Sequence, residues 1–345
     1  MNDLTVGFAT NRDPIRKRKK LPIDFGKGFN TPMDELRFGE VHLDLAGKVP
    51  GDFADAVELE AYATANLEVR AYDERADRTV LGSQTLFDRL KVLMDQKTDV
   101  LVYMHGYNVT FRQGVATGAA LQWLLSGPPT AAPPAMQVAT FSWPSDGKLT
   151  PYVAYRADRL DAKTSGPAFG RAFLKLYEYL RRIRPDDRCG GKMHLLCHSM
   201  GNYVLENAIQ HLEEFVPGRL PRVFDEIVLV AADVDADALE DRKKLGRLAE
   251  LGTRITVYIN HADKALLASD WTKGNPERLG QNGPSNLSNV PDKVDVVDTT
   301  PVVHDFKGHS YFLNGVVADD LREVLGAKAP TRRVRDERRQ RWRLS

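Results

Sequence analysis

The sequence predicts an α/β fold, in which helices cover both faces of a mostly parallel sheet. Apolar runs alternate along the chain with segments whose apolar residues recur at helical spacing, which is the pattern of repeated βα units. The runs at residues 99–104 and 225–232 are nearly continuous, which is typical of parallel strands buried on both faces. Further strands are expected before the first of these runs, as an N-terminal extension.

The N-terminal extension, residues 1–75, is expected to contain strands and irregular structure. Residues 4–10 predict a strand that ends at a turn rich in Asn, Asp and Pro. Residues 15–37 are basic and then rich in Gly and Pro, so we expect them to be irregular. Alternating apolar and polar residues predict a half-buried strand at 41–45, and another strand is expected at 67–71.

The remainder of the chain alternates between expected helices and strands. Apolar residues at helical spacing, among them Leu86 and Leu90, predict a helix at 83–96. A long helix at about 152–183 is expected to break or kink near Pro167, because proline removes a helical hydrogen bond. The other expected elements are helices at 112–125 and 310–325, and strands at 136–143, 254–260 and 294–297.

We expect one domain over residues 1–328, since neither a linker nor an internal repeat divides this stretch. Residues 329–345 have a different composition. They contain seven arginines and are expected to form a frayed or helical basic tail. Such a tail could bind an acidic partner or an anionic membrane surface, although a solvated tail is the more common outcome.

The composition argues against several classes of protein. Hydrophobic residues make up 42% and charged residues 28% of the 345 residues, as in soluble globular proteins. The formal net charge of +1 gives no reason to expect nucleic acid as a partner. The two cysteines, Cys189 and Cys197, form no disulfide framework or zinc pattern. We see no secretory signal and no apolar run of about 18 residues, so a cytoplasmic location is expected.

The stretch 192–205 carries the first sign of chemistry. An apolar run is followed by a tight turn and then by apolar residues at helical spacing, with Ser199 at the apex of the turn. This arrangement is the nucleophile elbow of α/β-hydrolases, whose usual form is Gly-x-Ser-x-Gly. Here Cys197 replaces the first glycine and Gly201 supplies the second. Both positions need small residues because the strand and helix backbones approach closely.

A serine nucleophile needs a base and an acid that orients the base, and in this fold they follow the serine in the order acid, then histidine. Asp263 follows the second strand after the elbow strand, which is the usual place of the acid. Asp233 is the rival. A structural interpretation of Asp233 and Asp235 is that they cap a helix that starts near residue 236.

His309 precedes the last expected helix, which is the place of the triad histidine. His304 is its rival. The side chain of His198 is expected to point away from that of Ser199, because the two residues are adjacent. The remaining histidines are expected in the core or on the surface, and no spacing suggests a metal site; they are His42, His194, His211 and His261.

An oxyanion hole needs two backbone N–H donors. One would come from Met200, directly after the nucleophile, and the other from Tyr107, in the loop after an earlier strand. In that loop Gly106 lets the backbone turn closely, and His105 is expected to fix the geometry and border the substrate. Trp143 ends a strand where it could line a substrate pocket or pack in the core. Tyr152, Tyr155 and Trp271 could form a pocket wall or lid, although Tyr152 and Tyr155, at helical spacing, are expected to pack in the core. Asn108 is expected to cap the following helix, and the alternative is that it holds the oxyanion loop.

Several stretches together resemble a bacterial α/β-hydrolase family of unknown function. They are Phe8-Ala-Thr-Asn-Arg, Tyr103-Met-His-Gly-Tyr-Asn, Phe141-Ser-Trp-Pro-Ser, Leu196-Cys-His-Ser-Met-Gly-Asn and Gly308-His-Ser-Tyr-Phe. The resemblance covers about residues 4–327 and implies the α/β-hydrolase fold with a triad of Ser199, Asp263 and His309. It implies an esterase-like or lipase-like serine hydrolase.

The sequence therefore predicts a serine hydrolase that cleaves small-molecule carboxylic esters through an acyl-enzyme. No metal or other cofactor is expected, and the oligomeric state stays open. An amidase, peptidase or thioesterase could use the same three residues. A hydrolase fold that serves only as a binding module is the alternative outside the enzymes.

Overall fold

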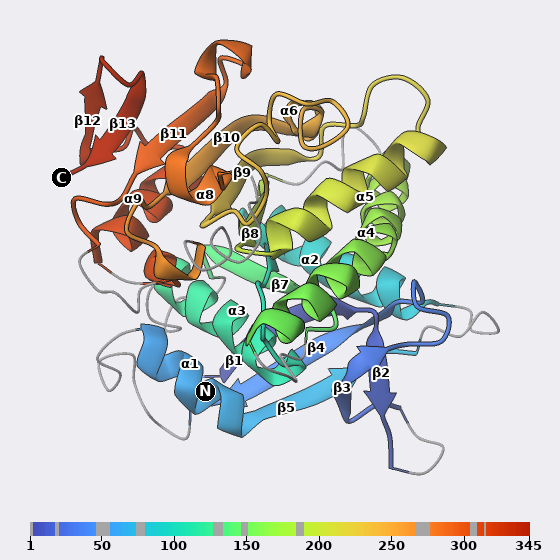
Figure 1. The fold of residues 1–345 in the computed structure, drawn as a ribbon. Helices are drawn as coiled ribbons and strands as arrows, with labels where there is room; N and C mark the ends of the chain where they lie inside the picture. Colours follow the sequence, from blue (N-terminus) through green and yellow to red (C-terminus); the bar gives the residue numbers. More distant parts are fainter. Residues whose placement is uncertain are drawn as a thin grey trace. The chain divides into compact units, whose positions relative to one another are not determined.

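The computed structural model describes residues 3–17, 21–45, 56–73, 80–126, 134–145, 151–183, 190–266, 277–303, 309–313 and 315–345. These residues fall into two compact units, residues 1–193 and 194–345 (Figure 1). The expectation of one domain over residues 1–328 stays a prediction. None of the helices in these ranges is both long and apolar enough to cross a membrane.

The first unit contains a sheet in the strand order β6-β7-β1-β4-β5 (Figure 1). β6, β7 and β1 run parallel, whereas β4 pairs antiparallel with β1 and with β5. The sheet thus joins a parallel core to an antiparallel N-terminal extension, as expected. The strands are β1 (Asp3–Thr10), β4 (Arg37–Asp44), β5 (Leu67–Ala71), β6 (Asp99–Met104) and β7 (Met136–Ser142).

Helices cover both faces of this sheet. A β-carbon added to Gly118 of α3 would lie 2.4 Å from the side chain of Thr140 and 3.2 Å from that of Val6. One added to Gly7 would lie 3.0 Å from Leu86 of α2. Because neighbouring residues of a strand point to opposite faces, α2 and α3 lie on opposite faces. The helices are α1 (Ala56–Asn66), α2 (Gly82–Asp95), α3 (Phe111–Ser126) and α4 (Pro151–Arg182).

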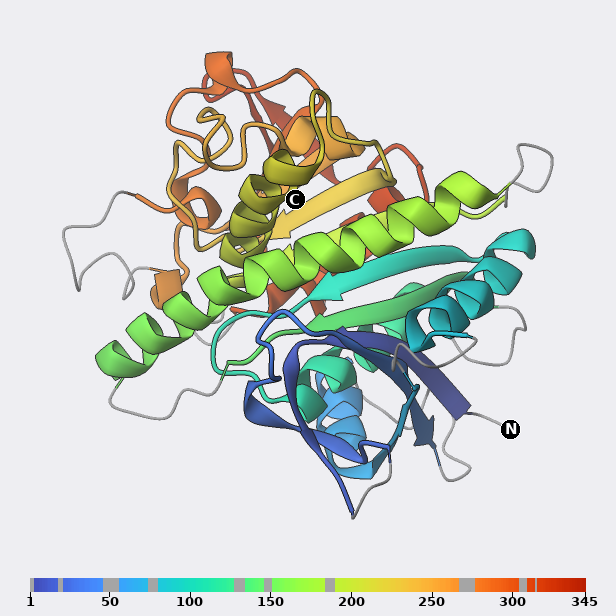
Figure 2. The same ribbon diagram turned by 90° about the vertical axis from the view of Figure 1, so that its right-hand side faces the viewer.

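Three expectations for the first unit are wrong. The stretch 15–37, expected to be irregular, contains the strand β3 (Asp24–Phe29), which pairs with β2 (Arg12–Ile15). Because β3 contains two glycines, its sequence does not indicate a strand. The helix α1 has no counterpart in the expected elements because alanines make up much of its buried face. The expected break in the long helix near Pro167 is wrong, because Figure 2 shows α4 continuing through the proline; a kink there stays a prediction. Its buried residues continue on both sides of the proline, so packing holds it together.

The second unit contains a sheet in the order β12-β13-β11-β10-β9-β8 (Figure 1). Its strands β8 to β11 pair in parallel and in sequence order, so their carboxyl ends meet at one edge. The strands are β8 (Met193–His198), β9 (Phe224–Val230), β10 (Gly252–Ile259), β11 (Val294–Asp298), β12 (Arg333–Asp336) and β13 (Arg341–Leu344). The helices are α5 (Gly201–Phe215), α6 (Leu248–Leu251), α8 (Leu279–Asn282), α9 (Gly315–Leu325) and the 3₁₀ helices η3 (Leu287–Asn289) and η4 (Tyr311–Leu313).

The C-terminal segment is not the frayed or helical tail that its composition predicts. It forms the hairpin of β12 and β13, and β13 pairs in parallel with β11. Arg333 binds the fully buried Asp320 of α9, with Nη2 2.8 Å from Oδ2. Arg341 binds Asp298 at the end of β11 at 2.9 Å. These two arginines neutralise buried carboxylates, which is why a segment so rich in charge belongs to the folded unit.

Replacing Arg333 by methionine should lower the free energy of unfolding by about 3 kcal/mol, because Asp320 would keep a buried charge without its cation. Urea unfolding at neutral pH measures the loss. Arg338→Met is the matched control, since Arg338 is exposed in the turn of the hairpin, and it should change stability by less than about 0.5 kcal/mol. Equal unfolding midpoints for the two variants would contradict a stabilising role of the hairpin.

Candidate active site

Ser199 occupies a strained turn between β8 and α5, as the elbow motif predicts. Its φ is 52°, in the left-handed region that non-glycine residues rarely adopt, and the residue is 4% exposed. Its N–H donates to the carbonyl of Val230 at 2.9 Å. Its carbonyl accepts from the N–H of Asn202 at 3.1 Å, from the Asn202 side chain at 2.9 Å and from the N–H of Asp233 at 3.2 Å. Bonds to the end of β9 and to the start of α5 thus hold the strained backbone.

Cys197 lies two residues before the nucleophile and is fully buried. Burial raises the pKa of its thiol well above the usual range, so the side chain stays neutral. Its carbonyl accepts a hydrogen bond from the Asn202 side chain at 3.1 Å. Cys197 therefore acts as a small apolar core residue at the position where the elbow usually has glycine.

Asp263 and His309, the expected acid and base, contact one another. Nδ1 of His309 lies 2.8 Å from Oδ2 of Asp263, whose side chain is 1% exposed. Oδ1 of Asp263 accepts hydrogen bonds from the N–H groups of Ala265 at 2.9 Å and Leu266 at 3.3 Å. Burial acts to raise the pKa of Asp263, but the hydrogen bond and charge of His309, with these two N–H groups, outweigh burial and lower that pKa. The carboxylate is therefore ionised and orients the imidazole.

Asp233, the alternative acid, forms an ion pair with Arg278. Its Oδ1 lies 3.3 Å from Nε of Arg278, whose Nη1 lies 2.7 Å from Asp235. Lys244 contacts Asp235 at 3.0 Å. The expected helix near residue 236 is wrong, because these residues form turns and Asp235 pairs with Arg278 in an isolated β-bridge. Of the two candidate acids, Asp263 is the one that contacts His309, at 2.8 Å.

His198 contacts His309, which sequence reasoning did not anticipate. Its Nε2–H donates to the backbone carbonyl of His309 at 3.0 Å, and the ring centroids lie 4.8 Å apart. Burial, followed by the nearby charge of His309, lowers the pKa of His198 to about 3. The residue is therefore neutral and positions His309 through its backbone. Nothing in the elbow motif signals this role, because the motif leaves the residue before the serine unspecified.

Tyr311 fixes the segment that follows His309. Its hydroxyl accepts from the N–H of Ala231 at 3.1 Å and donates to the carbonyl of Tyr258 at 3.1 Å. These two partners stand at the carboxyl ends of β9 and β10. The segment that begins with His309 is thus attached to the same sheet edge that carries Ser199. Among the described residues, no hydrogen bond joins the Ser199 hydroxyl to His309, a contact that in many hydrolases tightens only with substrate.

In the first unit, the loop after β6 is held by a buried polar network. Nδ1–H of His105 donates to the carbonyl of Gly106 at 2.9 Å, so its Nε2 accepts, and the hydroxyl of Ser142 lies 3.2 Å from it. The indole of Trp143 donates to the carbonyl of His105 at 2.9 Å, and the two rings stack at 5.3 Å. Trp143 is fully buried, which favours its interpretation as a packed core residue.

Arg12 joins this network from β2 and was not among the expected site residues. It is fully buried, and Nε donates to the Ser142 hydroxyl at 2.9 Å. Its Nη2 donates to the carbonyl of Val109 at 2.6 Å and lies 3.5 Å from Nε2 of His105. Arg12 therefore links the start and the end of the loop 105–109 to the end of β7. Three of the motifs that resemble a family, those at residues 8–12, 103–108 and 141–145, meet in this network.

Asn108 does not cap α3 as expected. Its φ is 55°, and its N–H donates to the buried Asp158 of α4 at 3.1 Å. Thr110 and Gln113 instead form a reciprocal cap: Thr110 N–H donates to the Gln113 side chain at 2.9 Å, and Gln113 N–H donates to the Thr110 hydroxyl at 3.3 Å.

Within the described ranges, no cluster of three or more His, Cys, Asp or Glu side chains could hold a metal ion.

A family model described as "Alpha/beta hydrolase of unknown function (DUF900)" matches residues 83–323. The chain belongs to this hydrolase family. The match confirms the family expected from the sequence motifs and the α/β-hydrolase fold. It includes the loop after β6, the elbow, Asp263 and His309, and it begins after β5, so Arg12 lies outside it.

The hydrolase is also 25% identical over 233 residues to "Uncharacterized protein alr1448" of Nostoc sp. (strain PCC 7120 / SAG 25.82 / UTEX 2576). The similar region covers 62% of this chain and 53% of the relative, so the chain spans about half the length of the curated relative it matches. The name of this relative states no activity.

Some expected site residues of the hydrolase stay predictions. Tyr107 lies in the first unit, where its ring is 6.1 Å from that of Tyr155, and Met200 lies in the second unit. Their pairing as oxyanion donors is therefore a prediction from the sequence alone. His304 and Trp271, Cys189 and the side chain of Tyr152 lie outside the described residues.

The buried His198 should make the stability of the hydrolase depend on pH. An unfolded histidine binds a proton near pH 6.5, whereas His198 stays neutral in the folded protein down to about pH 3. Between these values the unfolded state binds more protons, so stability falls as pH falls, by up to about 1.4 kcal/mol per pH unit from this group.

The variant His198→Gln should lack this contribution, because an amide can donate to His309 without titrating. Urea unfolding of both proteins at pH 8 and pH 5 measures the effect: wild type should lose more stability than the variant on acidification. His211→Gln, which removes a half-buried imidazole from α5, is the matched control. An identical loss in wild type and His198→Gln would contradict a buried neutral His198.

Proposed function

We propose that this protein is a serine hydrolase that cleaves carboxylic esters. The observation that carries the proposal is the 2.8 Å contact between His309 Nδ1 and the buried, ionised Asp263, beside a serine in the strained elbow conformation. Because Nδ1–H is directed at the carboxylate, Nε2 of His309 is left as the proton acceptor. An oriented imidazole next to a strained serine is the arrangement that acyl transfer requires.

In the proposed mechanism, Ser199 Oγ attacks the ester carbonyl while His309 Nε2 takes the hydroxyl proton. The tetrahedral intermediate carries its negative charge on the former carbonyl oxygen, which the N–H groups of Met200 and Tyr107 would stabilise. Losing one such donor typically costs about 10²–10³ in rate. His309 then protonates the departing alcohol. A water molecule, deprotonated by His309, attacks the carbonyl of the acyl-enzyme, and His309 returns this proton to Ser199 Oγ as the acid is released.

His198 and Tyr311 serve this mechanism as positioning residues. The base has to stay aligned with the serine while it gains and loses a proton twice in each cycle. Asp263 holds one ring nitrogen, His198 holds the backbone carbonyl of His309, and Tyr311 holds the following turn at 3.1 Å from each of two strand ends. These constraints support a fixed geometry for proton transfer, which is where positioned groups gain most of their catalytic effect.

The protein should react with a fluorophosphonate through Ser199, since only an activated serine attacks phosphorus at a useful rate. Intact mass spectrometry should show one adduct on wild type and none on Ser199→Ala. Hydrolysis of p-nitrophenyl esters of graded chain length should fall at least about 10³-fold in Ser199→Ala. Ser310→Ala, at an exposed serine next to the triad histidine, is the control and should keep activity. Failure of folded wild type to label would favour a binding module, and activity on amides or thioesters alone would change the substrate class.

Exchange of the two candidate acids for asparagine should separate their roles. Asp263→Asn should lower kcat by about 10⁴-fold with little change in KM, because the amide favours the wrong imidazole tautomer. Asp233→Asn should lower mainly the unfolding free energy, because it weakens the ion pair with Arg278. Steady-state kinetics and urea unfolding of both variants measure the two effects. A larger loss of kcat in Asp233→Asn would reverse the assignment of the acid.

A further inference from the structure

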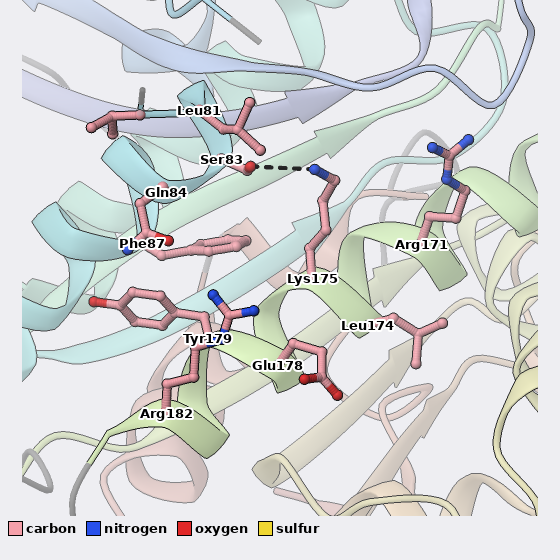
Figure 3. A pocket seen from close by; sticks show the side chains of 11 residues that line it. Leu81, Ser83, Gln84, Phe87, Arg171, Leu174, Lys175, Glu178, Tyr179 and Arg182 are labelled. Atoms are coloured by element: carbon pink, nitrogen blue, oxygen red, sulfur yellow. Dashed lines mark hydrogen bonds between the residues drawn. The ribbon is translucent and has the colours of Figure 1, made fainter. Parts of the chain in front are cut away.

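The first unit contains a groove between α2 and α4 with a volume of about 530 Å³. Figure 3 shows its side chains meeting across the two helices, with Lys175 of α4 directed at Ser83 of α2. The rings of Phe87 and Tyr179 pack in the same way, with their centroids 5.5 Å apart. These contacts across the groove hold α2 against α4, and none of them indicates a ligand.

In the second unit, Arg341 of the C-terminal hairpin reaches the turn that carries the proposed acid. It is the first residue of β13, the strand that pairs with β11 (Figure 1). Nη2 of Arg341 lies 2.9 Å from Oδ2 of Asp298, at the end of β11, and 2.8 Å from Nε2 of His261. His261 lies in the turn after β10, two residues before Asp263. Arg341 therefore bridges the ends of two neighbouring parallel strands.

The contacts of Arg341 belong to a closed ring. The N–H of His261 donates to the hydroxyl of Thr300 at 3.0 Å, and the N–H of Thr300 donates to Oδ1 of Asp298 at 3.0 Å. Arg341 closes the ring, because it contacts both Asp298 and His261. Arg341 and Asp298 are 5% and 3% exposed. The turn after β10 therefore cannot move without disturbing a buried ion pair, which is costly.

The contact with Arg341 also fixes the ring of His261. A guanidinium group has donors only, so Nε2 of His261 accepts the hydrogen bond. Its Nδ1–H then donates to Oδ1 of Asn282, the last residue of α8, at 3.2 Å. The imidazole is thus held from two sides, by β13 through Arg341 and by α8 through Asn282.

The turn that His261 anchors ends at Asp263. Oδ1 of Asn260 accepts from the N–H of Ala262 at 2.9 Å, and the carbonyl of Asn260 accepts from the N–H of Asp263 at 3.2 Å. In such a tight turn, the position of His261 determines the position of Asp263. A displacement of the turn would therefore lengthen the 2.8 Å contact between Asp263 and His309.

We propose that Arg341 is a positioning residue for Asp263, because it holds the turn 260–263 against the end of β11. The inference rests on the proposed function, in which Asp263 orients the base His309. Arg341 acts through His261 and Asp298. The hairpin that carries it, β12 and β13, lies beyond the residues 83–323 that the family model matches. A segment outside the matched region thus supports the catalytic acid.

Steady-state kinetics with a p-nitrophenyl ester test the role of Arg341. Arg341→Met should lower kcat about 10- to 100-fold with little change in KM, because a displaced acid orients the imidazole poorly. Arg343→Met, at an exposed arginine of the same strand, is the matched control and should keep the kcat of wild type. An unchanged kcat in Arg341→Met would overturn the inference.

Variants of His261 test the link without removing the buried ion pair. His261 is partly exposed, so His261→Ala should fold, and it should lower kcat as Arg341→Met does. His261→Gln should restore most of the activity, because its amide oxygen can accept the hydrogen bond from Arg341. Circular dichroism confirms folding of each variant. Equal losses of kcat in His261→Ala and His261→Gln would overturn the inference, and so would wild-type kcat in His261→Ala.

Proton NMR separates this inference from the proposed esterase activity. A proton between a histidine Nδ1 and a buried carboxylate gives a far-downfield resonance, which His309→Gln should lack. The resonance should weaken in Arg341→Met and His261→Ala and persist in Arg343→Met. Its absence from wild type, or its full intensity in Arg341→Met and His261→Ala, would overturn the inference. A weakened resonance in these variants, with a wild type that neither labels with fluorophosphonate nor cleaves esters, would overturn only the proposed function.

Discussion

The hydrogen bond between Asp263 and His309 is the interaction on which the candidate active site depends. Its partners are 46 residues apart and come from the turn after β10 and from the turn before η4. They meet because β10 and β11 are parallel and adjacent, so that the segments that follow them, with Asp263 and His309, leave the same edge of the sheet. His198 and Tyr311 attach the histidine to that edge, and the strained turn of Ser199 is bonded to the end of β9.

Both units contain buried charged side chains. Arg12 is fully enclosed and donates to side-chain and backbone oxygens around the loop after β6. Arg278 and Arg333 neutralise the acids Asp233 and Asp320, which are equally enclosed. A buried ion contributes specificity only if its partners are in place, because leaving one charge alone costs several kcal/mol. These arginines therefore fix the arrangement of loops and termini around the two sheets.

The second unit contains the proposed triad, where polar groups are buried and oriented by hydrogen bonds. Such an arrangement is suited to making and breaking a covalent bond, which needs fixed geometry.

The sequence by itself determined the features that depend on neighbouring residues. These include the alternation of strands and helices, the elbow around Ser199 and the order of acid and histidine that is usual in the α/β-hydrolase fold. Tertiary structure decided whatever depends on a distant partner. Arg278 pairs with Asp233, Asp263 contacts His309, and His198 reaches the His309 backbone 111 residues away. The arginine-rich C-terminal segment forms a hairpin because its arginines pair with the buried carboxylates of Asp298 and Asp320. The periodicity of the sequence indicates on which face of a helix or strand a residue lies. Which residue it contacts on that face depends on the tertiary fold.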